Sequence, residues 1–423
     1  MNIVARRVLA LTAMLVAAGC DDGPPPNTGG TTLPPGACGR GLVVVNSNAQ
    51  STNVSLVGLD GEVLSSSFFS SGSPTLDPQS QAPALSGDVV QPTMPQQGDR
   101  LVLIDRHFGV LSWVEVKTGK LQSLLPIGEE IALNLQDYIE VSPHKAYVPN
   151  LDPHLDPSLG AVEKGSNVVI VDPSAPAITG VVDLAPAMAS EDPRFYPRPT
   201  RGVLVGKRLY LLLAPFDQFF KEAVVSRVVT IDTDTDTILS TTRLTGLYNC
   251  TGLGLSPSGK RLAVTCSGTF HVNDAGQRIA DLSEAGVVLL TRSDDGLAEE
   301  RRWSAEALGE GPLGFSASFA SEDRLMFTTF GELGDDGKPV RDDTLLSLDI
   351  TSGEHEVRIR PANAFVLWET RCMPACGLCF ATEVGEGGKA LHRFEVKDGV
   401  FSADQSITVD AEIGLPPRYL GQF

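Results

Sequence analysis

The chain has 423 residues, of which 33 are Lys or Arg and 52 are Asp or Glu, and its formal net charge is −19. So acidic a chain repels nucleic acid, and it shows no basic stripe with interleaved aromatic residues, which excludes a nucleic-acid-binding function. Apolar residues make up 42%, enough for a large core, while 42 glycines and 29 prolines favour many turns over long helices.

Residues 1–19 predict a lipoprotein signal peptide. Arg6 and Arg7 form a positive start, an apolar stretch follows over 8–18, and the sequence AAGC at 17–20 resembles the lipobox of bacterial lipoproteins. The resemblance implies cleavage before Cys20 and lipidation of that cysteine, which anchors the protein stably to a membrane. The alternatives are an ordinary signal peptide and a short transmembrane anchor, although the apolar stretch is short for a bilayer span.

A tether and one large domain follow this signal. Residues 20–37 are rich in Pro, Gly and Thr and predict a flexible tether with nothing to pack. Residues 38–423 then form a single repetitive domain. We therefore expect a protein of the bacterial cell envelope, lipid-anchored to the inner or outer membrane and facing the periplasm or the cell surface.

The domain is built from seven hairpins of one pattern, in which an apolar alternating strand, a polar turn and a second strand follow one another. Their turns are Asp60–Gly61, Thr118–Gly119, Pro173–Ala175, Thr233–Thr235, Asp294–Gly296, Ser352–Gly353 and Asp398–Gly399. A compact apolar strand precedes each hairpin, and before most of these lies a further short strand. Four strands repeated seven times predict an all-β fold, a seven-bladed β-propeller with four-stranded antiparallel blades.

The amino-acid sequences of two repeats resemble those of a known family. The segments SPSGKRLAV at 256–264 and VVTIDTDTDTILST at 228–241 resemble the YVTN-type repeats of bacterial surface and periplasmic propellers. The resemblance covers residues 38–423 as architecture and implies a seven-bladed ring. It carries no activity, because this fold hosts binding modules and enzymes alike.

The ends of the domain predict how the ring closes. The first blade begins at Gly41 with its second strand, so its innermost strand is missing at the N-terminus. The C-terminal segment 417–423 (PRYLGQF) is left over after the seventh blade. We predict that this segment supplies the missing strand and locks the ring.

Six cysteines remain after Cys20, an even number that predicts disulfides in an exported protein. Cys250 and Cys266 are symmetric about a turn between adjacent strands, and Cys372 and Cys379 flank another such turn, so each pair should face across its hairpin. If the C-terminal strand closes the ring, Cys38 and Cys376 lie in neighbouring turns and form the third bond. The spacing Cys372-x3-Cys376-x2-Cys379 also matches the cluster-binding motif of radical SAM enzymes, and a zinc site is the other alternative.

Two acidic loops have ligand-like spacing. Asp232, Asp234 and Asp236 match the start of a calcium loop, but Thr237 and Arg243 stand where an EF-hand needs Gly and Glu, which favours a solvated turn. Asp152, His154 and Asp156 lie in one loop of the third blade and offer metal ligands, although the interposed prolines favour a plain polar loop. We therefore assign no metal site, and no motif indicates a catalytic residue or a cofactor.

One face of a propeller carries the loops between blades and those between second and third strands, and ligands usually bind there. The candidate members of that face are Arg106, His107, Asp152, His154, Arg194, Tyr196, Phe219, Phe220 and His271. The loop FDQFF at 216–220 is its most apolar cluster, and it either anchors a partner or packs on its own blade.

These features lead to two functional hypotheses. The first is a non-enzymatic binding scaffold, a monomer that holds an unidentified protein or polymer partner on this face. The alternative is a metal-dependent, lactonase-like hydrolase with carboxylates or histidines converging at the channel mouth. An electron-transfer protein with a quinone-type cofactor is a third possibility, for which no cofactor motif is visible.

Overall fold

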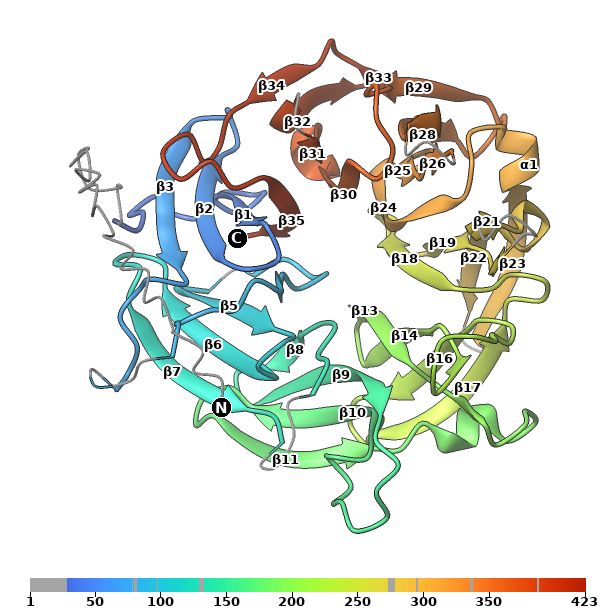
Figure 1. The fold of residues 1–423 in the computed structure, drawn as a ribbon, viewed down its shortest axis with the longest axis horizontal. Coiled ribbons are helices and arrows are strands. Elements are labelled where there is room, and N and C mark those ends of the chain that lie inside the picture. The colour runs from blue at the N-terminus through green and yellow to red at the C-terminus, as the bar shows by residue number, and fades with distance from the viewer. Residues whose placement is uncertain are drawn as a thin grey trace, which may run out of the picture.

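The computed structural model describes residues 29–423 except 78, 80–81, 97, 129–132, 273–277, 294–295, 335–337 and 386–387. In these ranges the chain forms seven antiparallel blades around a central channel, which confirms the predicted β-propeller (Figure 1). The predicted signal peptide, Cys20 and the start of the tether lie outside the described residues. Among the helices of the described part of the chain, none has the length and hydropathy to span a membrane.

Each blade begins with a strand beside the channel and ends with a strand at the rim. Blade 1 consists of β35 (Pro417–Gln422), β1 (Gly41–Ser47), β2 (Thr52–Gly58) and β3 (Val63–Ser70). Blade 2 consists of β4 (Val89–Val90), β5 (Arg100–Asp105), β6 (Val110–Glu115) and β7 (Leu121–Pro126). Blade 3 consists of β8 (Ile139–Ser142), β9 (Lys145–Pro153), β10 (Gly165–Asp172) and β11 (Ala177–Val182). Blade 4 consists of β13 (Pro199–Val205), β14 (Arg208–Leu213), β16 (Arg227–Asp232) and β17 (Thr237–Arg243).

The remaining blades follow the same order. Blade 5 consists of β18 (Cys250–Leu255), β19 (Arg261–Ser267), β22 (Ala285–Ser293) and β23 (Gly296–Ser304). Blade 6 consists of β24 (Leu313–Ser321), β25 (Arg324–Thr329), β28 (Thr344–Asp349) and β29 (His355–Ile359). Blade 7 consists of β30 (Leu367–Met373), β31 (Leu378–Gly385), β32 (Gly388–Lys397) and β34 (Gln405–Ile407), with β33 (Val400–Phe401) also paired to β32.

The position of a strand in its blade explains its residue pattern. All seven residues of β1 (GLVVVNS) are buried, because both faces of this inner strand pack against neighbouring blades. The rim strand β17 (TILSTTR) instead alternates between half-buried and exposed residues. The apolar core accordingly lies between adjacent blades; Trp303, Phe319 and Phe327, for example, fill the space between blades 5 and 6.

The ring closes as predicted, because β35 pairs with β1 and becomes the innermost strand of blade 1 (Figure 1). Val45 pairs with Tyr419 and Asn46 with Pro417, so Arg418 is an extra, bulged residue of β35. At the end of the chain the carbonyl of Phe423 accepts hydrogen bonds from the amides of Arg40 and Gly41. The C-terminal strand is therefore tied to the start of the domain along its whole length.

Three disulfides join the cysteines in the pairs that the sequence predicts. Cys250–Cys266 and Cys372–Cys379 each bridge residues that pair directly across an inner hairpin. Cys38–Cys376 links the two blades that meet at the closure and spans 338 residues of sequence. All three cysteines of the cluster-like motif are thus engaged in disulfides.

Blade 2 departs from the repeat, because its inner strand β4 has only two residues. The chain then enters the channel as Pro92, Thr93 and Pro95, and proline has no amide to donate to a ladder. The side chain of Gln96 compensates in part: its amide oxygen accepts from Val102 N at 2.6 Å and its amide nitrogen donates to Val102 O at 3.4 Å. The irregular segment leaves backbone groups facing the channel.

The described end of the predicted tether lies against the domain. The amide of Thr31 donates to the carbonyl of Val116 at 2.9 Å, and Arg40 Nε donates to Leu33 O at 2.7 Å. These hydrogen bonds to main-chain carbonyls hold the described part of the predicted tether against the domain.

The loops between blades and those between second and third strands share one face, here named the upper face. Three two-stranded ribbons lie in these loops: β12 (Phe195–Tyr196) with β15 (Phe216–Asp217), β20 (Phe270–Val272) with β21 (Arg278–Ala280), and β26 (Glu332–Leu333) with β27 (Pro339–Arg341). The short helices η1 (Ala185–Met188), η2 (Leu282–Glu284) and α1 (Ala305–Leu308) also fall in these connections, whereas η3 (Pro374–Cys376) forms an inner turn of blade 7. The extra ribbons make the upper face the more elaborated one.

Candidate functional site

A cavity of about 490 Å³ opens where the channel meets the upper face, a volume typical of small-molecule sites. Every blade contributes to its wall, mainly through the upper ends of inner strands. The contributors include, from blades 1 to 7 in turn, Ser47, Gln91, Leu151, Thr200, Thr251, Phe315 and Trp368. The ring therefore brings residues from all parts of the sequence to one site.

Five charged side chains line this cavity, namely Asp88, Arg106, Arg201, Glu369 and Arg418. Arg106 Nε donates to Asp88 at 3.0 Å, and Arg201 Nη1 donates to Glu369 at 2.8 Å. Within each of these two pairs, the carboxylate neutralises the charge of the arginine. The wall is left with one positive charge that has no acidic partner, in a chain whose net charge is −19.

The uncompensated charge belongs to Arg418, the bulged residue of β35. Its Nε donates to Ser47 O at 2.8 Å, and its guanidinium carbon lies 4.6 Å from the centre of the Trp368 ring. These two contacts fix the plane of the guanidinium. Its two terminal nitrogens make no hydrogen bond or ion pair with any described residue.

Aromatic rings form one wall of the cavity beside Arg418. Trp368 meets Tyr419 edge to face at 6.0 Å between ring centres, and Phe315 lies 6.2 Å from Trp368. Phe216 and Phe220 line the cavity from blade 4, with their rings 5.4 Å apart. The wall therefore offers flat apolar surfaces next to a fixed cation.

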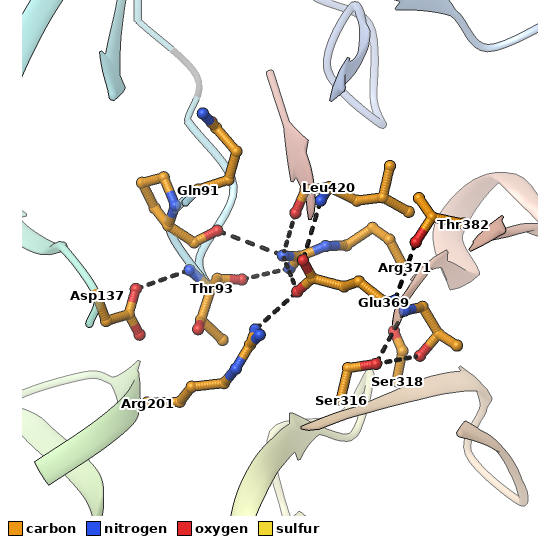
Figure 2. Close-up of polar contacts among 12 residues, drawn as sticks. Gln91, Thr93, Asp137, Arg201, Ser316, Ser318, Glu369, Arg371, Thr382 and Leu420 are labelled. Carbon is orange, nitrogen blue, oxygen red and sulfur yellow. Dashed lines mark hydrogen bonds and ion pairs between the residues drawn. The ribbon is translucent and has the colours of Figure 1, made fainter. Parts of the chain in front are cut away.

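The floor beneath the cavity is a buried polar network that joins opposite blades (Figure 2). Glu369 on β30 accepts from Arg201 on β13 and, through its other oxygen, from Leu420 N at 3.0 Å. Arg371 donates to Thr93 O at 2.5 Å and to Leu420 O at 2.8 Å. Figure 2 shows Arg201 directed toward Glu369 from the opposite side of the channel, and Arg371 beside Glu369 on the same strand.

Asp137 completes the floor by binding the irregular segment of blade 2. Its carboxylate accepts from the amides of Thr93 and Tyr138 at 2.8 Å each and from Gly202 N at 2.9 Å. The backbone groups that blade 2 leaves unpaired thus find partners in the channel, as buried polar groups require. The floor is a structural plug with its polar groups largely satisfied.

Burial governs the protonation equilibria of this floor. Burial raises the pKa of the Asp137 carboxyl, although hydrogen bonds from the amides of Gly202 and Thr93 partly offset it. Burial also lowers the pKa of the Arg371 guanidinium, against the opposing charge of Glu369. For Arg201 the cost of burial is outweighed by Glu369 and Asp137, so its pKa is raised.

Of the nine residues predicted for the binding face, Arg106 and Phe220 line the cavity. His107 is exposed beside Arg106, and Phe219 projects from the loop 216–220 with 69% of its surface exposed. His271 lies on β20, paired with Ile279.

Arg194 and Tyr196 belong to the outer part of the upper face. Arg194 pairs with Glu222 at 2.7 Å and stacks on Phe195 at 4.8 Å. Tyr196 lies on β12, opposite Phe216 of β15. Neither residue is part of the cavity wall.

Asp152 and His154 do not form the metal site that the sequence suggested as an alternative. The Asp152 carboxylate accepts from Arg198 at 2.7 Å and from Asn134 at 2.8 Å, whereas Asp156 is occupied with the backbone and hydroxyl of Ser158. Within the described ranges no group of three or more His, Cys, Asp or Glu residues is placed to hold a metal ion.

Arg198 is a residue that no sequence pattern singled out. Its buried guanidinium donates to the carbonyls of Asp217 and Gln218 at 2.8 and 3.0 Å and lies 3.6 Å from the centre of the Phe220 ring. Arg198 thereby holds the 216–220 loop at the cavity. A charged residue directly before an inner strand, beside an aromatic loop, is the signal that could have identified it.

Asp232, Asp234 and Asp236 are turn residues, as the sequence favoured. Asp232 accepts from the amides of Asp234 and Thr235 at 2.9 and 3.2 Å, and these bonds together with Arg208 lower the pKa of its carboxyl. Asp236 pairs with Lys145 at 2.6 Å. Their oxygens are thus engaged within the protein.

Comparisons with known proteins find structures of the same fold but assign the chain to no family. No family model matches the chain, and no curated protein matches it. Solved structures do. Kuenenia stuttgartiensis hydrazine synthase aligns over 90% of this chain and 98% of its own, at 12% identity and a TM-score of 0.53. A candidate 6-phosphogluconolactonase from Bacteroides uniformis covers the same shares at 10% identity and 0.52.

A third similar structure is the β-propeller domain of Myceliophteria thermophila Cps50 (Swd1), with 84% of this chain and 98% of that domain aligned, 13% identity and a TM-score of 0.51. At such identities the likeness shows the fold alone, and proteins of very different names share it. Function must therefore be argued from the site.

Proposed function

We propose that this protein is a bacterial cell-envelope lipoprotein whose monomeric propeller is a non-enzymatic binding scaffold, with its partner held on the upper face. The observation that carries the proposal is the contrast within the channel. The floor is closed by paired charges, while the mouth is open and has an exposed aromatic loop at its rim, Phe219 being 69% exposed. Exposed aromatic groups around a cavity are typical of binding surfaces.

The envelope location is supported by the N-terminal sequence and by the disulfides. The sequence AAGC at 17–20 after an apolar stretch resembles a lipobox, and lipidated Cys20 would anchor the domain to the inner or outer membrane. Disulfides persist in oxidising compartments, and the structure contains three. The resemblance of the repeats to YVTN-type sequences also fits a location in the cell envelope.

The metal-dependent hydrolase is the weaker candidate, because the two carboxylates that line the cavity already have partners. Asp88 is bound by Arg106 and Glu369 by Arg201. A Lewis-acid mechanism needs ligands that converge on one point and remain free to bind the ion. Elemental analysis of the purified protein checks this argument, and a stoichiometric divalent metal would revive the hydrolase.

The experiment that tests the scaffold is crosslinking in intact envelopes of the native host, followed by purification of the protein with its partner. Phe219→Ser should abolish the crosslinked species, since Phe219 projects from the rim without supporting the fold. Val400→Ser is the matched control, because Val400 is equally exposed, at 69%, but lies on β33 of blade 7, away from the cavity. Equal crosslinking in both variants would remove the loop from the proposed surface.

Anchoring is tested separately by mass spectrometry of the mature N-terminus. A diacylglyceryl-modified Cys20 is the expected result, and Cys20→Ala should leave the signal peptide uncleaved. Cleavage at another residue without lipid would show an ordinary signal peptide instead.

A further inference from the structure

We propose that the cavity at the channel mouth binds a small organic anion, with a single carboxylate held by Arg418 and a planar apolar body packed against Trp368 and Phe315. The proposal deepens the proposed function and rests on it in one respect, since both require an open upper face.

Charge complementarity is the first argument. Two acids and three arginines line the cavity, and the two acids are each paired with an arginine, so Arg418 alone is uncompensated. Its position is half-buried, where an ionic interaction is stronger than in open water. An anion with one negative charge would neutralise the wall, whereas a cation would meet an excess of positive charge.

The preparation of Arg418 is the second argument. The bulge in β35 turns its side chain out of the ladder, the bond from Nε to Ser47 O fixes one edge, and Trp368 supports one face. The free edge presents the two terminal nitrogens, which match the two oxygens of a carboxylate. Little conformational entropy remains to be lost when such a ligand binds.

A second unsatisfied donor lies in the same cavity wall. Gln91 is only 5% exposed, and its amide nitrogen is buried without a hydrogen-bond partner among the described residues. Buried donors are normally paired, so an unpaired one in a cavity wall indicates a group that a ligand supplies. A carbonyl or hydroxyl oxygen on the body of the ligand would satisfy it.

The shape of the cavity is the third argument. The floor is closed by Arg201, Glu369 and Arg371, so a ligand enters from the upper face only (Figure 2). Phe315 and Trp368 offer adjacent aromatic surfaces beside the guanidinium. A flat apolar body of one to three rings fits a volume of about 490 Å³ and can stack on this wall.

A matched pair of probes tests the charge requirement. 1-Naphthoate and 1-naphthamide have nearly the same shape, but only the first carries a carboxylate. Isothermal titration of the detergent-solubilised full-length lipoprotein, with detergent alone as the blank, should show one naphthoate per protein, bound about tenfold or more tightly than naphthamide. Equal affinities, or no binding of naphthoate, would overturn the proposal.

Variants of Arg418 then test the residue. Arg418→Met should weaken naphthoate about ten- to hundredfold while leaving naphthamide unchanged, because the methionine keeps the apolar stem and removes the donors. Arg360→Met is the control, since Arg360 is a surface residue paired with Glu310 at 2.7 Å, and it should leave both affinities unchanged. An unchanged naphthoate affinity in Arg418→Met would contradict the assignment.

Arg418→Lys decides the case in which the methionine variant loses both probes through collapse of the wall. Lysine keeps the charge but not the planar fork, so a preference for naphthoate over naphthamide that is smaller than in the wild type supports the proposal, and a preference unchanged from the wild type rejects it. The crosslinking experiment reports independently. Naphthoate binding without any captured macromolecule would support the cavity assignment and reject the scaffold function. A captured macromolecule without naphthoate binding would support the scaffold function and reject the cavity assignment.

Discussion

The floor and the mouth of the channel use the same side chain in opposite ways. Arg371 on the floor donates through both terminal nitrogens to the carbonyls of Pro92, Thr93 and Leu420, and so ties its own strand to blade 2 and to β35. Arg418 at the mouth donates a hydrogen bond to the protein only through Nε. The comparison shows that a buried arginine in a propeller channel is not by itself a binding group; what matters is which donors remain unused.

The comparison predicts that breaking the floor has the largest effect on stability. Glu369→Gln leaves the buried Arg201 and Arg371 without the carboxylate that they share, and the free energy of unfolding should fall by about 3–5 kcal/mol. Urea denaturation followed by circular dichroism measures the change. Glu310→Gln, which breaks a surface pair, should cost at most about 1 kcal/mol. Similar losses in both variants would show that the floor is not a structural plug.

The clasp at the ring closure is the next largest contribution. Replacing Cys38 and Cys376 by serine should lower the free energy of unfolding by about 2–4 kcal/mol, because the bond closes a loop of 338 residues in the unfolded chain. The pair Cys372–Cys379 closes only 7 residues, so its double serine variant should lose less. The reverse order in denaturant titrations would argue against closure as the role of the first bond.

Blade 7 contains a buried titratable group outside the channel, His392, which should make the stability of this blade depend on pH. His392 lies between Glu383 and Asp404, with nitrogen–oxygen distances of 2.9 and 2.8 Å. Burial lowers the pKa of His392, but hydrogen bonds to these carboxylates outweigh it and the net pKa is raised. The resulting stability is therefore fully present below a pH of about 6.5 and is lost as the pH rises through the folded-state pKa.

The test compares the wild type with His392→Gln over a range of pH. The wild type should be more stable by about 1.5–3 kcal/mol at pH 5.5, and the difference should shrink as the pH rises. Glu383→Gln should weaken the same dependence. A difference that grows with pH would contradict the assignment of a protonated imidazole.

The smallest effect on stability is expected at the mouth. Arg418→Met removes one hydrogen bond to Ser47 and a cation–π contact on a half-buried residue, so the free energy of unfolding should change by less than about 1 kcal/mol. Thermal unfolding measures it. A loss as large as that of Glu369→Gln would place Arg418 with the floor and would remove the basis for a binding role.

The sequence predicted the ring because its repeat is local. Turns such as Thr118–Gly119 mark each outer hairpin, and the symmetry of Cys250 and Cys266 about a turn is visible in a single segment. Even the closure by 417–423 followed from counting strands. These inferences need only short-range patterns and the requirement that each blade bury its faces.

The cavity could largely not be predicted from the sequence, because its charged residues come together only after the ring is formed. Arg201 and Glu369 are 168 residues apart, and each appears in the sequence as one polar residue in a short strand. A signal did exist in WETRC at 368–372, where two charged residues fall within an inner strand and must face the channel. The opposite case is Asp152, which had ligand-like spacing but is held by Arg198, a partner 46 residues away.

The most direct test of the account is a crystal structure of the protein with a brominated naphthoate, located by its anomalous signal. We expect bromine density in the cavity beside Trp368, with the carboxylate on the terminal nitrogens of Arg418 and the Arg201–Glu369 pair unchanged below it. Bromine density elsewhere on the protein, or a carboxylate bound by Arg201 or Arg371 of the floor, would contradict the claim that the mouth binds while the floor holds the ring.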